Sequence, residues 1–200
     1  HSISNSDAWM LSTFNENNKY SGAASYDPKR KSKKQLIEGP YSYGRFNMAQ
    51  NDNKNRLLFT KESFTDFPNL WSTTTSFKSP KQITDANPQQ SDYNWGTAEM
   101  VEWTSLDGKP LRGMLIKPEN FDPNKKYPLF MYQYSGPGSQ SVANRWNSSN
   151  DYWYQMLAQK GYVVACVDGR GTGLKGAAFK KVTQKELGKY EVEDQIQAAK

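Results

Sequence analysis

The chain has 200 residues, of which 36% are hydrophobic and 14% are aromatic, a composition that is typical of folded proteins and excludes disorder of the whole chain. The 26 Lys and Arg against 20 Asp and Glu give a net charge of +6, but no basic stripe interleaves with aromatic residues, so we expect no nucleic-acid partner. The mean hydropathy of −0.91 and the lack of an apolar run near the roughly 20 residues of a membrane span predict no transmembrane segment in this sequence.

Residues 1–90 have the pattern of β structure, because short apolar runs alternate with clusters of Asn, Asp, Ser, Gly and Pro. The main runs lie at residues 8–13, 20–26, 56–61 and 70–77. A weak repeat places Ile37 and Ile83 46 residues apart, within the roughly 40 to 50 residues of a four-stranded propeller blade. The alternative is an ordinary meander or sandwich, since two blades do not close a propeller of about 4 to 8 blades.

Residues 87–96 are polar and suit a crossing between domains, after which strands alternate with helical sequence. The predicted elements are strands at 99–103, 111–116 and 128–134, a helix at 151–160, a buried parallel strand at 162–167 and helical sequence at 176–200. Asp107 and Gly108 predict a hairpin turn, and Gly161 predicts the end of a helix. This alternation predicts an α/β sheet that the 200 residues do not complete.

The single cysteine and the single histidine limit the chemistry of the chain. Cys166 alone forms neither an internal disulfide nor a cysteine-based zinc site, and we expect no metal. His1 stands at the terminus, where chains are often poorly ordered, so we expect it to be a bystander. Most hydrolytic sites that use Ser, Cys or zinc require a histidine, so an enzyme containing this chain needs further sequence.

Residues 171–176 (GTGLKG) match the G-x-G-x-x-G fingerprint of dinucleotide sites. However, residues 168–170 separate the motif from the preceding strand, and Glu191 and Glu193 lie in helical sequence rather than at the end of a second strand. We therefore favour a glycine-rich turn that crosses the sheet edge and expect no cofactor, with dinucleotide binding as the alternative.

Other catalytic motifs are missing or are better explained by structure. The sequence contains neither a G-x-S-x-G nucleophile motif nor a phosphate-binding loop. Glu191, Glu193 and Asp194 form an acidic cluster, which we interpret as a solvated helix face near the positive end of the helix dipole.

Tyr134 ends the predicted strand at 128–134, and residues 135–140 (SGPGSQ) follow it as a sharp turn. Ligands of open α/β sheets bind beyond the carboxyl edge of the strands. A phenol at this edge can donate a hydrogen bond to a developing oxyanion, a contribution on the order of 3 kcal/mol for one such donor. From the pattern alone, a tyrosine that packs in the core is the alternative.

Four sequence blocks occur in a familiar order across residues 99–200: residues 126–129 (KYPL), 134–140 (YSGPGSQ), 168–173 (DGRGTG) and 187–195 (LGKYEVEDQ). Together they resemble the dipeptidyl peptidase IV branch of the prolyl oligopeptidase family of serine peptidases. Within the first ninety residues, the resemblance is limited to the propeller-like repeat and residues 67–71 (FPNLW).

The resemblance implies an all-β plus α/β fold: residues 1–96 as the last blades, about two, of a β-propeller, and residues 97–200 as the N-terminal half of an α/β-hydrolase domain. It implies that Tyr134 is the oxyanion-hole donor and that the Ser, Asp and His of the triad lie outside these 200 residues. Gly138 is a departure from the family pattern, because some relatives have a cysteine at this position. The difference concerns a structural disulfide of those relatives and not the catalytic chemistry. We expect Asp168 and Arg170 to pair with each other, or with the missing half, and to order loops.

The resemblance further implies a fragment of a serine exopeptidase that is inactive alone. The intact protein would release dipeptides from peptide substrates, often after proline; tripeptidyl and acylaminoacyl release remain open. It would be periplasmic or secreted, and a homodimer is one assembly that the resemblance allows. The alternative function is a non-catalytic binding module built on the propeller.

Overall fold

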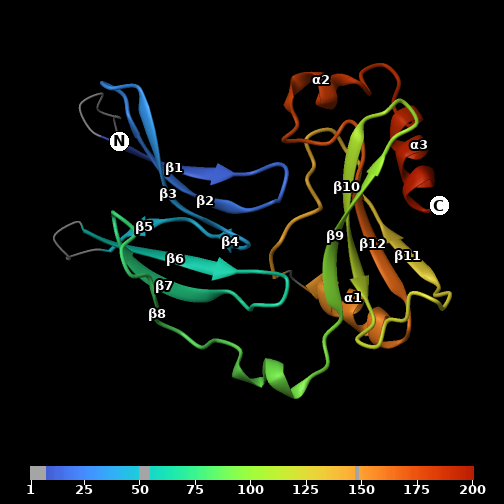
Figure 1. The fold of residues 1–200 in the computed structure, drawn as a ribbon, viewed down its shortest axis with the longest axis horizontal. Helices are drawn as coiled ribbons and strands as arrows, with labels where there is room; N and C mark the ends of the chain where they lie inside the picture. Colours follow the sequence, from blue (N-terminus) through green and yellow to red (C-terminus); the bar gives the residue numbers. More distant parts are fainter. Residues whose placement is uncertain (1–7, 50–54, 147–148) are drawn as a thin grey trace. The chain divides into compact units, whose positions relative to one another are not determined.

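The computed structural model describes residues 8–49, 55–146 and 149–200 (Figure 1). The chain divides into two compact units, the first comprising His1–Gln90 with Asn144–Trp146 and the second comprising Ser91–Ala143 with Asn147–Lys200. His1 itself lies outside the described residues. Within the described ranges, no helix has the length and apolar character needed to cross a membrane.

The first unit begins with an antiparallel sheet in the order β1-β2-β3. Its strands are β1 (Trp9–Phe14), β2 (Ser21–Asp27) and β3 (Ser32–Gly39). The Asp27 carboxylate accepts hydrogen bonds from the backbone N–H groups of Lys29 and Arg30 at 2.9 and 3.0 Å, so this side chain shapes the turn between β2 and β3. The strands predicted at 8–13 and 20–26 are confirmed, and each begins and ends one residue later than predicted.

A second antiparallel sheet has the order β4-β6-β7-β8, and β5 also pairs with β6. Its strands are β4 (Ser42–Tyr43), β5 (Asn47–Met48), β6 (Arg56–Glu62), β7 (Asn69–Thr74) and β8 (Lys81–Gln82). The strand predicted at 70–77 ends early, at Thr74, because the chain turns there. Phe77 has a φ of +55°, and its N–H donates to the Thr74 carbonyl oxygen at 2.8 Å.

Aromatic rings form the core beside the second sheet. Phe59 on β6 is 1% exposed, and its ring centroid lies 5.8, 5.4 and 6.1 Å from those of Tyr43, Phe46 and Phe77. Leu57 lies two positions earlier on the same strand, so it shares this face and is equally buried. Leu57 and Phe59, which lie on one face of β6, thus supply part of the core of the first unit.

The second unit contains a mixed sheet in the order β11-β12-β10-β9. Its strands are β9 (Thr97–Thr104), β10 (Pro110–Lys117), β11 (Leu129–Tyr132) and β12 (Val163–Asp168), and the short helix η1 (Pro88–Asp92) precedes them. β9 and β10 form the predicted antiparallel hairpin, and Gly108 at its turn has a φ of +80°, which favours glycine. The hairpin prediction is confirmed.

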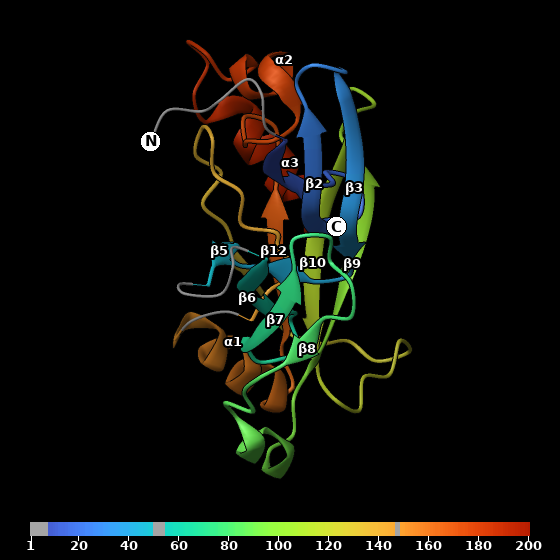
Figure 2. The ribbon, with the colours of Figure 1, turned by 90° about the vertical axis from the view of Figure 1, so that its left-hand side faces the viewer.

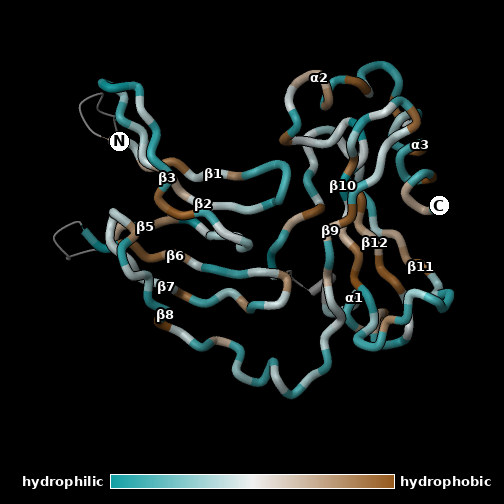
Figure 3. The backbone as a smooth tube through the Cα atoms, viewed as in Figure 1, coloured by the Kyte–Doolittle hydropathy of each residue, from teal (hydrophilic) through white to brown (hydrophobic). Residues whose placement is uncertain are grey.

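β12 is a buried strand at the interior of this sheet. Val164, Ala165, Cys166 and Val167 are at most 6% exposed, and Figure 3 shows apolar residues along the strand. β12 pairs in parallel with β11 and antiparallel with β10. A strand with neighbours on both sides and little solvent contact requires a continuous apolar run, so the prediction of a buried parallel strand is confirmed.

In the described part of the second unit, the sheet is accompanied by the helices α1 (Ser149–Gln159), α2 (Gly176–Lys181) and α3 (Lys189–Ala198). Figure 2 shows α2 and α3 near the carboxyl end of β12 and α1 near its start. Gly161 has a φ of +85°, and its N–H donates to the Ala158 carbonyl oxygen at 2.9 Å, which confirms the predicted end of α1. The helical sequence at 176–200 is interrupted because Lys185 and Gly188 both have positive φ.

We predict that Phe59→Ala lowers the free energy of unfolding of the first unit by about 3–5 kcal/mol, because it removes a ring from a closed aromatic cluster and leaves a cavity. Met48→Ala is the control, since Met48 is 46% exposed and its truncation should change stability by no more than about 0.5 kcal/mol. Hydrogen exchange of the β6 and β7 amides measures both effects. Equal protection in the two variants would contradict the assignment of Phe59 to the core.

Candidate functional site

Tyr134 lies just beyond the carboxyl end of β11. The strand ends at Tyr132, two residues earlier than the sequence predicts, and Tyr132 is in register with Cys166 on the parallel strand β12. Tyr134 is 71% exposed, so the alternative of a core tyrosine is wrong. Its phenol stands at the edge where two parallel strands end, which is the edge at which α/β sheets bind ligands.

The turn after Tyr134 fixes the backbone beside the ring. Ser135 is buried and has a φ of +52°, a conformation that few non-glycine residues adopt. A Cβ at Gly136 would lie 2.6 Å from Cε1 of Tyr134, so the ring lies directly against this glycine. The Ser139 hydroxyl donates to the Gly136 carbonyl oxygen at 2.6 Å and closes the turn.

Asp168, at the end of β12, anchors the same loop from the other side. Its carboxylate accepts hydrogen bonds from the backbone N–H groups of Ser141 and Val142, at 2.9 and 2.7 Å, and from Nε2 of Gln140 at 2.6 Å. The side chain is nearly inaccessible to solvent, and these donors compensate the desolvation of its charge. Asp168 therefore orders a loop, as expected, but its hydrogen bonds go to residues 140–142 and not to Arg170.

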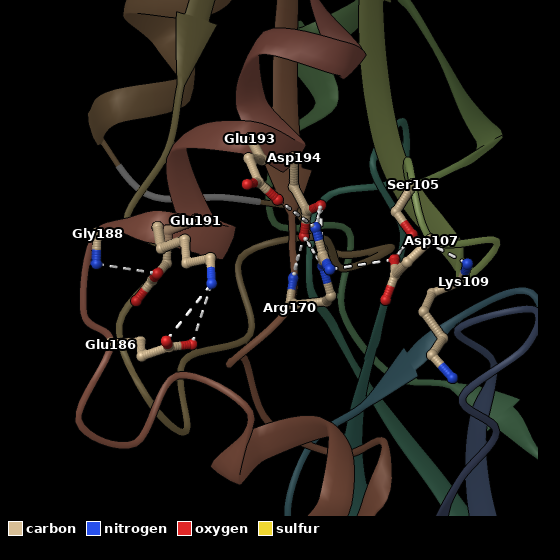
Figure 4. A network of polar contacts seen from close by, with 10 residues as sticks. Ser105, Asp107, Lys109, Arg170, Glu186, Gly188, Glu191, Glu193 and Asp194 are labelled. Atoms are coloured by element: carbon tan, nitrogen blue, oxygen red, sulfur yellow. Dashed lines mark hydrogen bonds and ion pairs between the residues drawn. The ribbon is translucent and has the colours of Figure 1, made fainter.

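Arg170 lies two residues further and is buried among three carboxylates (Figure 4). Its guanidinium contacts Asp194 at 2.7 Å, Asp107 at 3.0 Å and Glu193 at 3.2 Å. Its backbone N–H also donates to Asp194 at 2.7 Å. The hydrogen bonds that the Arg170 guanidinium donates to the Asp194 carboxylate raise the pKa of Arg170 further above its ordinary value, so the charge is permanent. The prediction that Arg170 pairs with Asp168 is wrong, because its partners here are Asp107, Glu193 and Asp194. A contact with the missing half stays a prediction.

The ring of Tyr190 adds a cation–π contact, at 4.4 Å from the guanidinium carbon of Arg170. Asp107 belongs to the β9–β10 turn, where the Ser105 hydroxyl donates to its carboxylate at 2.6 Å. That hydrogen bond, more than the charge of Arg170, lowers the pKa of the Asp107 carboxyl. The network thus joins the hairpin turn, the turn after β12 and helix α3.

Within the acidic cluster of α3, the predicted solvated face is wrong for Asp194, whereas Glu191 lies in the first turn of the helix, near the positive end of its dipole, as predicted. Asp194 is 0% exposed and faces Arg170, while the Glu191 carboxylate accepts a hydrogen bond from the Gly188 N–H at the start of the helix. No local spacing predicts the pair of Asp194 and Arg170, which are 24 residues apart. The available signal is general: an arginine two residues after a buried strand needs a carboxylate partner if it is itself buried, and the acidic cluster follows it in the sequence.

The glycine-rich turn is packed closely within the second unit. The N–H groups of residues 171–173 donate to the carbonyl oxygens of Phe179, Gly169 and Ser139 at 3.2, 3.4 and 2.8 Å. They are therefore not free to bind a pyrophosphate, and the six-residue helix α2 that follows is short. This geometry agrees with the favoured interpretation of a packed turn. Among the described residues, no group of three or more His, Cys, Asp or Glu has the arrangement of a metal site.

Comparison with known proteins finds that this chain is similar to peptidases. Residues 147–200 match the model of the prolyl oligopeptidase family. A probable dipeptidyl-aminopeptidase B of Ajellomyces capsulatus is 40% identical over 103 residues, which are 52% of this chain and 11% of that protein. The dipeptidyl peptidase 4 of Porphyromonas gingivalis superimposes with a TM-score of 0.81 and 30% identity, over 97% of this chain and 27% of that one. A putative dipeptidyl aminopeptidase IV of Bacteroides ovatus superimposes with a TM-score of 0.79 and 25% identity. This match covers 96% of this chain and 27% of that one.

These matches confirm the resemblance to the prolyl oligopeptidase family, in its dipeptidyl peptidase IV-like branch, over the parts of the chain that they cover. They also agree with a fold of β sheets followed by an α/β unit, while the number of propeller blades stays a prediction. The chain spans only about a tenth of the length of the curated relative and about a quarter of the two solved structures.

We predict that Arg170→Met lowers the free energy of unfolding of the second unit by about 3–5 kcal/mol, because it leaves the buried Asp194 carboxylate without its charged partner. Hydrogen exchange of the β12 and α3 amides measures the change. Lys189→Met is the control: it breaks an ion pair with Glu186 in which both side chains are about half exposed, and should have little effect. Equal losses in the two variants would contradict a special role for Arg170.

The depressed pKa of Asp107 predicts a dependence of stability on pH. Its folded pKa lies below the ordinary value of 3.8, so the ionised carboxylate stabilises the folded state above that pH, and the contribution is lost as the pH falls through the folded value. The stability difference between the wild-type chain and Asp107→Asn should therefore be constant from pH 7 to 5 and shrink below pH 3.8. Urea denaturation across this range tests it, and a difference that grows toward acid would contradict it.

Proposed function

We propose that this chain is part of a serine peptidase of the dipeptidyl peptidase type, in which Tyr134 donates a hydrogen bond to the oxyanion of the tetrahedral intermediate. The observation that carries the proposal is the exposed phenol of Tyr134 at the carboxyl edge of parallel strands, on a loop that buried side chains hold. The family resemblance and the names of the matched relatives support the reaction class.

The proposed reaction begins when a serine oxygen attacks the acyl carbon of a peptide bond and a histidine accepts its proton. Negative charge then develops on the former carbonyl oxygen. Tyr134 donates its phenolic proton in a hydrogen bond to this oxygen, and the backbone N–H after the nucleophile serves as second donor. The histidine returns the proton to the leaving amine. A donor that is already oriented stabilises the transition state without reorganisation cost.

The serine, the histidine and its aspartate are proposed to lie in sequence outside these 200 residues. The sequence contains no G-x-S-x-G motif, and its one histidine is His1. We therefore expect the 200 residues by themselves to have no peptidase activity. A longer reading frame with G-x-S-x-G after Lys200, followed by Asp and then His, is the expected arrangement, and its absence would favour the non-catalytic binding module.

The proposed substrates are peptides from which dipeptides are released at the N-terminus, often after proline. The names of the matched proteins support the release of dipeptides over tripeptidyl or acylaminoacyl release, while the preference for proline rests on the family resemblance alone. We further propose, by the same resemblance, a periplasmic or secreted location, and a homodimer for the intact protein.

We predict that Tyr134→Phe, made in an active peptidase that contains these 200 residues, lowers kcat about 100- to 1000-fold while KM changes little, because the lost hydrogen bond forms only when the oxyanion develops. Turnover of a dipeptide linked to a chromophore gives both constants. Tyr93→Phe is the matched control, because Tyr93 is 64% exposed in the same unit and has no proposed role. An unchanged kcat in a folded Tyr134→Phe enzyme would refute the proposal.

A further inference from the structure

The torsion at Ser135 sets how Tyr134 lies against the rest of the loop. Strand β11 fixes the chain before Tyr134, and Asp168 fixes the chain at residues 140–142. Between these anchors, Ser135 has a φ of +52°, and such a conformation costs about 1–3 kcal/mol in a non-glycine residue. A strained torsion persists only where surrounding contacts hold it, so the contacts of Ser135 decide the position of the phenol.

One such contact comes from helix α3. Nε2 of Gln195 donates to the Ser135 hydroxyl oxygen at 3.0 Å and also reaches the Val167 carbonyl oxygen at 3.4 Å. Ser135 is 6% exposed, so this hydrogen bond is shielded from competing water. Gln195 therefore links the turn after β11 to the end of β12.

The position of Gln195 is itself fixed by its neighbour in the sequence. Asp194 is fully buried and bonds both the backbone N–H and the guanidinium of Arg170. A Cβ at Gly169 would lie 3.0 Å from Cβ of Asp194, so the helix packs directly on the turn after β12. The first turns of α3 have little freedom to move, and Gln195 is presented to Ser135 in one place.

We infer that Gln195 is a positioning residue that acts through Ser135 to hold the phenol of Tyr134 in its donating orientation. Gln195 hydrogen-bonds to Ser135 and Val167 and acts indirectly, while the exposed phenol of Tyr134 is the group that contacts the substrate. The inference rests on the proposed function of Tyr134. It deepens that proposal by assigning to α3 the task of maintaining a strained backbone torsion.

The test is a double-mutant cycle in an active peptidase that contains these 200 residues. Gln195→Met keeps the length of the side chain and removes its donor, and should lower kcat about three- to tenfold, the effect of one neutral hydrogen bond, with KM almost unchanged. Ser135→Ala should cause a similar loss, and the two changes together no more than either alone. Gln197→Met, on the same helix, is the matched control and should leave kcat unchanged.

The decisive comparison is made in the Tyr134→Phe background. If Gln195 acts through the phenol, Gln195→Met changes the remaining kcat less than about twofold there. An equal loss in both backgrounds would overturn the positioning role while leaving the proposed function intact. A Tyr134→Phe enzyme with full kcat would overturn the proposed function and this inference together. If Gln195→Met does not fold, Ser135→Ala takes its place in the same comparison.

Discussion

The second unit depends on the burial of one positive charge. Arg170 cannot lose its proton, so its guanidinium enters the interior only where carboxylates surround it. Asp194 and Glu193 contact it from α3, and Asp107 contacts it from the β9–β10 turn. Because the network needs all of these segments in place at once, it fixes α3 against the end of β12.

A second buried charge complements the first. Asp168 lies two residues before Arg170, and its carboxylate binds the loop that follows Tyr134. The segment 168–170 therefore makes two connections. The Arg170 guanidinium holds α3, and the Asp168 carboxylate holds the loop after Tyr134. Gln195 closes the connection, since it bonds Ser135 from the helix that Arg170 anchors. All of these contacts form within the chain itself, and a donor that is oriented in advance is what electrostatic stabilisation of an oxyanion requires.

Local patterns in the sequence predict the elements of the second unit and the place of Tyr134. The hairpin at Gly108, the end of α1 at Gly161 and the buried strand β12 each follow from neighbouring residues alone. The apolar run that ends in a glycine- and proline-containing turn also places Tyr134 at the sheet edge, although its role as a donor comes from the family resemblance and stays a prediction.

The partners of the buried charges were not predictable in the same way. Asp194 has the composition of a solvated helix residue, and only the fold brings it to Arg170, 24 residues earlier. Ser135 also gives no sign in the sequence of its left-handed backbone, because serine adopts many conformations and the strain is imposed by anchors on both sides. Such long-range contacts decide the geometry of the candidate site.

The most direct measurement is a crystal structure of an active peptidase containing these residues, with a boronate bound as a tetrahedral adduct on its nucleophile. We expect Oη of Tyr134 to lie about 2.5–3.0 Å from an adduct oxygen. We also expect the Gln195–Ser135 hydrogen bond and the buried Arg170–Asp194 pair to remain intact. An adduct oxygen bound by another side chain, with the Tyr134 phenol turned away from it, would contradict the oxyanion role of Tyr134.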